Sequence, residues 1–496
     1  MRPRKMLLAA LAALLLAVII GGLAFDRPPE LPAASPKLVK ASQGLDEIVI
    51  EASLSPEERT LTVRQTLRLL NRTGQDQNAA VLRTWPNAFQ NIDTSPCTFE
   101  EKLYDRFYPD GFSSGALVMK TAQAAGQPVL HRYTDESKTV MAVPVPGGWK
   151  AGENAEIELE YTVQIPRMAY RFGLWDGIYA LGNAFAVPAV WEDGAFRTDG
   201  YAPVGDPFVT DCANYTVSVT VPEGYVCAGS GWAETEKAKG EITFRFSAPA
   251  VRDFALVISD RFVSAQALEG GVLITAYASD ASRAREMLKD ARKALGVYES
   301  LWGEYPYQSY TLAEIHMPLG GMEYPALAMI SSDDLAQGGR ELEYLIAHET
   351  AHQWWYALVG SDGFHQPWQD EALSEFGVLE YAGSVYGEQE RSDLEQTRVE
   401  SAMRVTVSQG ITPGAPLDRF SSMSEYSLVV YNRGAAYFCA LDRMLPDGLN
   451  PFLRQYAQDF AFSCASRGEF EQLLAASTGE DFSPLTRDYL DTAILN

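Results

Sequence analysis

The pattern of hydrophobic and polar positions divides this chain into a strand-rich first half and a helix-rich second half. Between residues 48 and 262, apolar residues recur at every second position in several runs, a period typical of strands with one buried face. The clearest runs cover residues 48–54, 61–69, 157–163, 215–221 and 242–246. We therefore predict an antiparallel β domain over residues 45–262.

Beyond this region the spacing changes to that of helices. Apolar residues between positions 287 and 302 fall on one helical face, and a strand is expected over residues 310–317. The segment 341–359 is apolar nearly all round, which predicts a buried helix that ends at Gly360. Because 496 residues are too many for one core, we assign residues 263–496 to a second, mainly helical domain.

The first 25 residues differ from both domains. Several basic residues precede the uncharged run Met6–Phe25, whose twenty residues are enough to span a bilayer. We expect a membrane anchor with everything after Asp26 outside the cytoplasm, because basic flanks stay inside. A signal peptide cleaved near Gly22 and Ala24, which would give a secreted protein, is the alternative. Residues 26–44 are rich in proline and are expected to form an extended linker.

Charge and cysteine content exclude some classes of function. The net charge of −25 argues against a nucleic-acid partner, since phosphate binding needs a basic face. The five cysteines are widely spaced and form no CxxC metal pair. They allow at most two disulfides of undetermined pairing, and buried free thiols are equally compatible with the sequence.

A candidate catalytic zinc site lies in the apolar segment 341–359. His348 and His352 are four positions apart, so on a helix both imidazoles reach one metal ion. Glu371, expected on a further helix, would be the third ligand and would leave the fourth position open for water. Glu349 lies between the histidines, where a general base is needed. Buried polar groups need partners, and a metal ion satisfies all of these together.

Four motifs together resemble the aminopeptidase-N family of zinc metallopeptidases. The run His348–Glu371 is similar to its zinc signature, HExxH followed by eighteen residues and a glutamate. The segments 320–323, 431–434 and 181–207 resemble three further family motifs in the same order. The resemblance covers roughly residues 45–445. It implies one zinc ion, a saddle-shaped β domain and a thermolysin-like catalytic domain, in a short bacterial-like form without the family's further helical domain.

The resemblance also implies roles for individual residues. Glu349 would activate the water molecule, and Tyr431 would donate a hydrogen bond to the oxyanion. Glu323 would bind the free α-amine of the substrate. Gly320 and Gly321 would let the backbone approach the substrate closely.

Two features depart from the family pattern near the amine-binding glutamate. Tyr324 and Pro325 stand where the family usually has asparagine. The second amine-binding residue, which the family takes from its amino-terminal domain, should lie near Asn183, where no matching acid is evident.

The sequence therefore predicts a multi-domain α+β zinc metallopeptidase that releases N-terminal residues from peptides. The first alternative is an endopeptidase with the same zinc chemistry. The second is a membrane-anchored, non-catalytic peptide-binding protein with a structural zinc. Glu349 and Tyr431 disfavour the second alternative, because a structural site needs neither.

Overall fold

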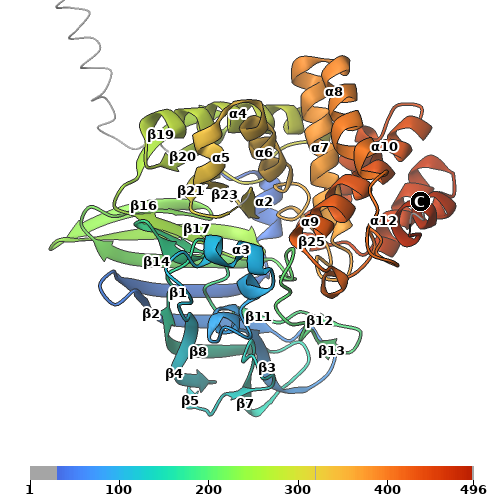
Figure 1. The fold of residues 1–496 in the computed structure, drawn as a ribbon. Helices are drawn as coiled ribbons and strands as arrows, with labels where there is room; N and C mark the ends of the chain where they lie inside the picture. The colour runs from blue at the N-terminus through green and yellow to red at the C-terminus, as the bar shows by residue number, and fades with distance from the viewer. Residues whose placement is uncertain (1–30, 319, 494–496) are drawn as a thin grey trace, which may run out of the picture.

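The computed structural model describes residues 31–318 and 320–493, which fold into a β-rich region followed by a mainly helical region (Figure 1). The β-rich region is blue to green in Figure 1, and the helices that follow it run from yellow-green to red. This arrangement confirms the predicted fold class: an antiparallel β region followed by a mainly helical domain.

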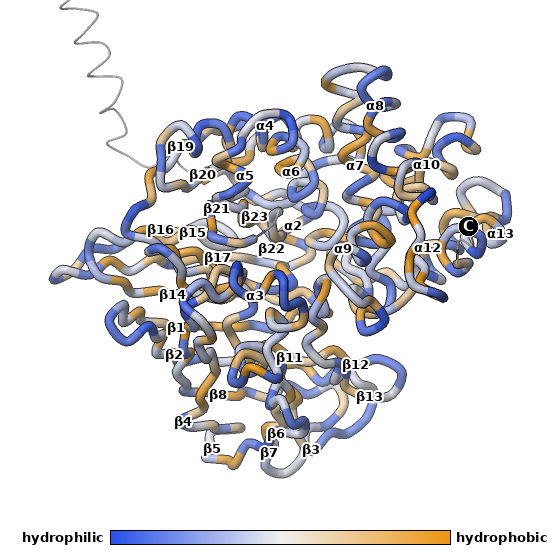
Figure 2. The backbone as a smooth tube through the Cα atoms, viewed as in Figure 1, coloured by the Kyte–Doolittle hydropathy of each residue, from blue (hydrophilic) through white to orange (hydrophobic). Residues whose placement is uncertain are grey.

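An eight-stranded sheet forms the centre of the β-rich region, in the order β16-β17-β14-β1-β2-β8-β4-β5. All its neighbours are antiparallel except β1 and β14, which pair in parallel. Every second residue of β1 is buried, from Ile48 to Leu54, as the sequence period predicts. Hydrophobic and hydrophilic stretches alternate along these strands (Figure 2). The bounds are β1 (Asp46–Ser55), β2 (Thr60–Leu70), β4 (Ala116–Ala124), β5 (Gln127–Pro128), β8 (Asn154–Gln164), β14 (Ala213–Pro222), β16 (Trp232–Ala238) and β17 (Glu241–Val251).

Smaller sheets and short helices complete the β-rich region. One sheet has the order β15-β18-β10-β9 and another β11-β3-β7-β6, with a separate hairpin β12-β13. Their bounds are β3 (Gln77–Arg83), β6 (Arg132–Tyr133), β7 (Val140–Trp149), β9 (Phe172–Trp175), β10 (Ile178–Leu181), β11 (Val187–Pro188), β12 (Trp191–Glu192), β13 (Ala195–Phe196), β15 (Val226–Gly229) and β18 (Leu256–Ser259). The short helices are α2 (Pro36–Ala41), η1 (Trp85–Phe89), η2 (Pro96–Thr98) and α3 (Glu101–Phe107).

The second region begins with a mixed five-stranded sheet in the order β19-β20-β21-β23-β22. Strand β22 is at the edge and runs antiparallel to β23. The strands are β19 (Val263–Glu269), β20 (Val272–Ala278), β21 (Ser309–Ile315), β22 (Gly321–Tyr324) and β23 (Leu327–Ser331). Helix α4 (Ala281–Trp302) contacts β19 and β20 and packs beside α6 (Gly339–Ala351), which in turn packs on α7 (Trp368–Tyr386).

The remaining elements are mostly helical. They are α5 (Ser332–Gln337), α8 (Glu388–Leu394), η3 (Glu395–Glu400), η4 (Leu417–Arg419), α9 (Met423–Tyr426), η5 (Ser427–Arg433), α10 (Gly434–Met444), α11 (Asn450–Asp459), α12 (Arg467–Thr478), α13 (Ser483–Thr486) and η6 (Arg487–Asp491). Two short strands, β24 (Val359–Gly360) and β25 (Ser463–Cys464), pair in parallel.

The zinc-motif helix is shorter than predicted. We expected it to continue to Val359, but α6 ends at Ala351. Trp354 and Trp355 instead turn into the core, where both rings contact Trp302. The chain then pairs as strand β24. An apolar run predicts burial, but it does not distinguish a helix from a buried turn.

The N-terminal predictions are tested only in part. Helix α2 begins at Pro36 and buries Leu38, so this part of the expected linker is not extended. No helix in the described residues is long and apolar enough to cross a bilayer. The predicted anchor or signal peptide, residues 1–25, lies outside the described residues.

Candidate active site

Three potential metal ligands meet where helix α6 ends and helix α7 begins. His348 and His352 lie one turn apart at the end of α6, and Glu371 lies in the first turn of α7. The two histidine Nε2 atoms are 3.0 Å apart, and each lies 3.3 Å from Glu371 Oε2. Ligand atoms that surround one tetrahedral zinc at about 2.0–2.1 Å are about 3.3 Å apart. The triangle therefore fits three ligands of one zinc ion.

The surroundings of this triangle favour a cation. Glu371 Oε2 is buried and has no hydrogen-bond partner within residues 31–318 and 320–493. Burial lowers the pKa of His348, but Glu371 and Glu375 outweigh this effect and raise it to about 9. The buried carboxylates thus stabilise positive charge at the ring nitrogens, and a divalent metal ion supplies such charge without a proton.

Further acidic side chains orient the two imidazoles. Asp370 Oδ1 lies 2.6 Å from His352 Nδ1 and accepts a hydrogen bond from its N–H, which leaves the Nε2 lone pair free to face the triangle. His348 Nδ1 lies 3.6 Å from Glu375 Oε2, and Arg398 donates to the other oxygen of Glu375 at 3.1 Å. Only 5% of Glu375 is exposed, so it belongs to the site and not to a solvated helix face.

Glu349 lies beside the ligands without being one of the three. It is 3% exposed, and its Oε2 atom finds no hydrogen-bond partner in the described part of the chain. Burial raises the pKa of Glu349 to about 7. A Cβ atom at Gly321 would lie 2.4 Å from Glu349 Oε1, so only glycine allows this approach. The structure therefore gives Gly321 a second reason to be glycine besides the expected approach of substrate.

Tyr431 lies over the ligand triangle. Its hydroxyl donates to Glu371 Oε1 at 2.5 Å, and its ring stacks on His348 with centroids 5.5 Å apart. The ring of Tyr426 packs edge-on against the ring of Tyr431, with their centroids 5.6 Å apart. Both tyrosines come from the turn of α9 and η5, which also lines the cavity described below. The structure thus brings the Tyr431 hydroxyl next to the three potential metal ligands.

The predicted substrate-binding segment forms the edge strand β22. Gly320 adopts a positive φ of 70°, and its N–H donates to Asp334 Oδ2 at 3.1 Å. Glu323 is 5% exposed and accepts no hydrogen bond in the described residues. One carboxylate oxygen of Glu323, one of Glu349 and a ring nitrogen of His352 lie within 4.8 Å of one another. Glu323 therefore faces the same space as Glu349 and the metal ligand His352.

The departure from the family pattern at Tyr324, where asparagine is usual, has a structural explanation. The Tyr324 hydroxyl donates to Asn183 Oδ1 at 3.0 Å, and a Cβ at Gly182 would collide with that hydroxyl. Asn183 is therefore occupied by a contact between the two regions. Asp206 of the β region lines the same two cavities as Glu323, and sequence reasoning did not assign it a role.

A cavity of about 900 Å³ opens over the ligand triangle. The metal ligands, β22 and η5 form its walls on one side, and residues 96–107 and 203–206 of the β region form the other. Arg106 of α3 donates to the Pro318 carbonyl and pairs with Asp333 at 3.3 Å. Glu100 accepts a hydrogen bond from the Met423 N–H. Both regions therefore enclose the space in which a substrate would bind.

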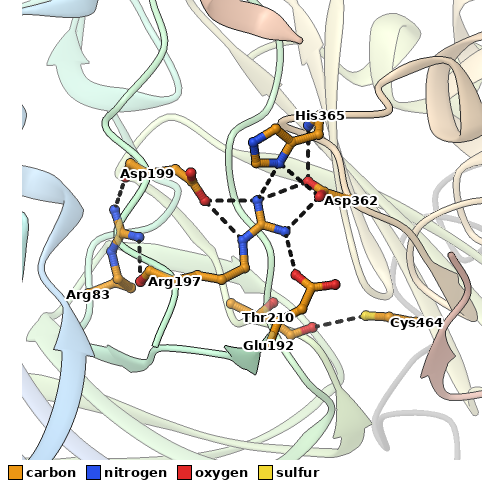
Figure 3. Close-up of polar contacts among 8 residues, drawn as sticks. All are labelled: Arg83, Glu192, Arg197, Asp199, Thr210, Asp362, His365 and Cys464. Carbon is orange, nitrogen blue, oxygen red and sulfur yellow. Dashed lines mark hydrogen bonds and ion pairs between the residues drawn. The ribbon is translucent and has the colours of Figure 1, made fainter. Parts of the chain in front are cut away.

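A cluster around Arg197 joins the β region to the loop that precedes α7 (Figure 3). The Arg197 guanidinium pairs with Asp362 at 2.8 Å, with Asp199 at 2.8 Å and with Glu192 at 3.1 Å. Asp362 also contacts His365 Nδ1 at 2.9 Å. The cluster fixes the β region against the loop that leads into the helix of Glu371.

Comparisons with known proteins agree with this geometry. Residues 287–489 match the Peptidase family M1 domain. The chain is 22% identical over 373 residues to Aminopeptidase B from Mus musculus, which covers 70% of this chain and 54% of that protein. It is 28% identical over 193 residues to Leucine aminopeptidase 2 from Candida glabrata, which covers 36% of this chain and 28% of that protein. The chain spans about half the length of the first of these relatives.

Solved structures share the fold of nearly the whole chain. An M1 zinc metallopeptidase from Deinococcus radiodurans superposes with a TM-score of 0.65 at 19% identity, over 93% of this chain and 96% of that chain. Native yeast LTA4 hydrolase gives a TM-score of 0.65 at 15% identity, over 96% of this chain and 72% of that chain. This chain therefore carries a domain of peptidase family M1, the aminopeptidase-N family that its sequence motifs resemble.

Proposed function

We propose that this protein is a zinc-dependent aminopeptidase, which hydrolyses the first peptide bond of peptides with a free N-terminus. The observation that carries the proposal is the convergence of the ligand triangle, Glu349, Tyr431 and Glu323 on one cavity. Zinc held by His348, His352 and Glu371 would polarise the scissile carbonyl and acidify a water molecule.

Glu349 is the general base in this proposal. Its carboxylate takes a proton from the attacking water and returns it to the leaving amine. A base works best when its pKa is close to the working pH, and burial raises the pKa of Glu349 to about 7. Its unpartnered Oε2 atom leaves an acceptor free for the water.

Tyr431 stabilises the negative charge that develops on the carbonyl oxygen. Its hydroxyl already lies 2.5 Å from Glu371 Oε1, and so within the immediate surroundings of the metal site. A donor fixed at this position strengthens its hydrogen bond as the oxygen becomes charged, which lowers the barrier.

Glu323 selects the free N-terminus. Its buried carboxylate has no hydrogen-bond donor in the described residues, so a substrate ammonium group would satisfy it. A blocked N-terminus would leave this charge unpaired. The related structure of an M1 zinc metallopeptidase mutant from Deinococcus radiodurans, bound to a Tyr-Ser-Ala substrate, supports short peptides as the substrate class.

We also propose that the enzyme acts outside the cytoplasm and is held to the membrane by residues 1–25. The support is the basic start and the twenty-residue uncharged run in the sequence. Fractionation of cells that express the full chain tests this: recovery with membranes, and digestion by added protease from outside, support it. Recovery of a shortened, soluble protein would support the cleaved signal peptide.

The activity is tested by mass spectrometry of a peptide library after incubation with the protein. We expect sequential loss of N-terminal residues, abolished by a chelator and restored by zinc. Glu349→Gln is the matched control, since it keeps the side-chain shape and removes the base. Cleavage that persists in this variant, or that survives complete removal of zinc, would contradict the proposal.

A further inference from the structure

The two histidines of the ligand triangle differ in how firmly their outer ring nitrogens are held. Three acceptors surround His352 Nδ1: Asp370 Oδ1 at 2.6 Å, Ser374 Oγ at 3.1 Å and the Trp355 carbonyl oxygen at 3.2 Å. In the described part of the chain, His348 Nδ1 has only Glu375 Oε2 beside it, at 3.6 Å. This distance is longer than that of a direct hydrogen bond. The polar contact that orients His348 therefore depends on where Glu375 lies.

Arg398 fixes the position of Glu375. Its Nη1 atom donates to Glu375 Oε1 at 3.1 Å, and the other carboxylate oxygen faces His348. Glu375 is 5% exposed, and Arg398 is the one arginine or lysine that pairs with it in residues 31–318 and 320–493. A buried carboxylate that loses such a partner is strongly destabilised. The position of Glu375 beside the imidazole thus depends on the guanidinium behind it.

Arg398 comes from a different segment than the metal ligands. It lies in η3, a stretch of π-helix, a geometry that is frequent at functional sites. Its side chain is 26% exposed and lines the cavity over the ligand triangle. Its Nη2 atom also donates to Glu341 Oε2 at 2.7 Å, but the Glu341 side chain is 79% exposed. Because exposed ion pairs contribute little, the buried contact with Glu375 is the one that can affect the metal site.

We infer that Arg398 is a positioning residue that acts through Glu375 to hold His348 in the orientation that binds zinc. The inference deepens the proposed function, because it concerns retention of the metal ion on which that function rests. Outer partners of metal-bound histidines fix the ring orientation and make the imidazole a stronger ligand. For His352 this partner is Asp370, the neighbour of Glu371 in the sequence. For His348 it is an ion pair between α7 and η3.

The test measures the zinc dissociation constant by competition with a chelator, in protein shown to be folded by circular dichroism. Arg398→Met removes the guanidinium and keeps an unbranched side chain. We expect its zinc dissociation constant to rise about 10- to 100-fold, the range for outer partners of metal ligands.

Arg404→Met is the matched control for the loss of one positive charge. Arg404 lies shortly after η3, its side chain is 74% exposed, and its ion pair with Glu400 is 3.7 Å long. This variant should change the zinc dissociation constant less than about threefold, because exposed ion pairs contribute little. Glu341→Gln, which breaks only the exposed ion pair of Arg398, should likewise stay within about threefold.

A double-mutant cycle shows whether Arg398 acts through Glu375. Glu375→Leu alone should weaken zinc binding, and the addition of Arg398→Met should weaken it no further, because both changes remove the same contact. The double variant replaces a buried ion pair by apolar side chains, so it should fold even where Arg398→Met alone does not. Its zinc dissociation constant should then show the same 10- to 100-fold rise.

A spectroscopic measurement separates positioning from a general loss of stability. With Co²⁺ in place of zinc, the visible absorption bands depend on the geometry of the ligands. We expect these bands to shift in Arg398→Met and to stay unchanged in Arg404→Met.

An unchanged zinc dissociation constant in Arg398→Met, unshifted cobalt bands, or fully additive effects of Arg398→Met and Glu375→Leu would overturn the role of Arg398. Failure of the wild type to hydrolyse any peptide is a different outcome. It would refute the proposed aminopeptidase activity, but the comparison of zinc dissociation constants would still test Arg398 directly.

Discussion

The metal centre and the space around Glu323, where we propose that the substrate amine binds, differ in how the chain builds them. The ligands of the metal centre come from two consecutive helices, and each histidine has an acidic partner at its second nitrogen. The space around Glu323 lies between strand β22 and the loop of the β region that carries Asp206, and Glu323 accepts no hydrogen bond in the described residues. The first site is assembled locally and is preorganised, whereas the second depends on how two regions are docked.

The largest effect should come from the metal ligands. His348→Ala or His352→Ala removes one of three ligands, so we expect loss of stoichiometric zinc together with activity. Metal analysis and peptide hydrolysis measure both. His316→Ala is the control, because this histidine lies outside the ligand triangle. Full zinc content in both ligand variants would contradict the assignment.

Removal of the base should leave the metal centre intact. Glu349→Gln should fold and keep zinc, but lose at least about 10²- to 10⁴-fold in kcat, the range of general base catalysis. Zinc content and kcat are compared with those of the wild type. Turnover similar to that of the wild type would refute the role of Glu349.

The oxyanion donor should have the next largest effect. Tyr431→Phe removes only the hydroxyl, so we expect kcat to fall about 10²- to 10³-fold with little change in KM. Steady-state kinetics on one peptide separate the two parameters. If KM alone changed, Tyr431 would act in packing or in substrate binding.

The smallest effect concerns the hydrogen bonds that Asn183 and Tyr356 donate to Asp253. Asp253 accepts hydrogen bonds from Asn183 at 3.3 Å and Tyr356 at 2.9 Å, and burial raises its pKa from 3.8 to about 7. Between pH 4 and pH 7 the folded protein therefore keeps a proton that the unfolded chain has lost. Stability is lost as the pH rises through this window.

Asp253→Asn should remove this dependence. We compare the melting temperature of the variant with that of the wild type at pH 5 and at pH 8. The variant's advantage should be larger at pH 8 than at pH 5, by about 2–4 °C. Melting curves at the two pH values measure this difference, with the exposed Asp260→Asn as control. Parallel pH profiles for the wild type and Asp253→Asn would show that Asp253 does not carry the effect.

The same difference between the sites explains how much the sequence predicted. Helix spacing places His348 and His352 on one face, and the spacing to Glu371 is a family pattern, so the ligand set could be identified. The alternation in β1 and β2 likewise predicted antiparallel strands, which the structure confirms. These signals are local, so they can be seen without the tertiary structure.

The remaining features depend on contacts between distant segments. Asp206 reaches the site through its pairing with Arg171, and no periodicity relates these residues to Glu323. The end of α6 depends on where Trp354 and Trp355 pack. Neither could be read from the sequence, because burial and close approach there are decided by the tertiary fold.

The central claim is that zinc chemistry is combined here with recognition of a free N-terminus. The most direct measurement uses one peptide in free and N-acetylated form, and identifies the first bond cleaved by the wild type and by Glu323→Ala. The account predicts that the wild type removes the first residue of the free peptide much faster than it cleaves the acetylated one, and that Glu323→Ala reduces this difference. Cleavage of internal bonds in the acetylated peptide at the rate of the free peptide would contradict it, and would favour the endopeptidase alternative.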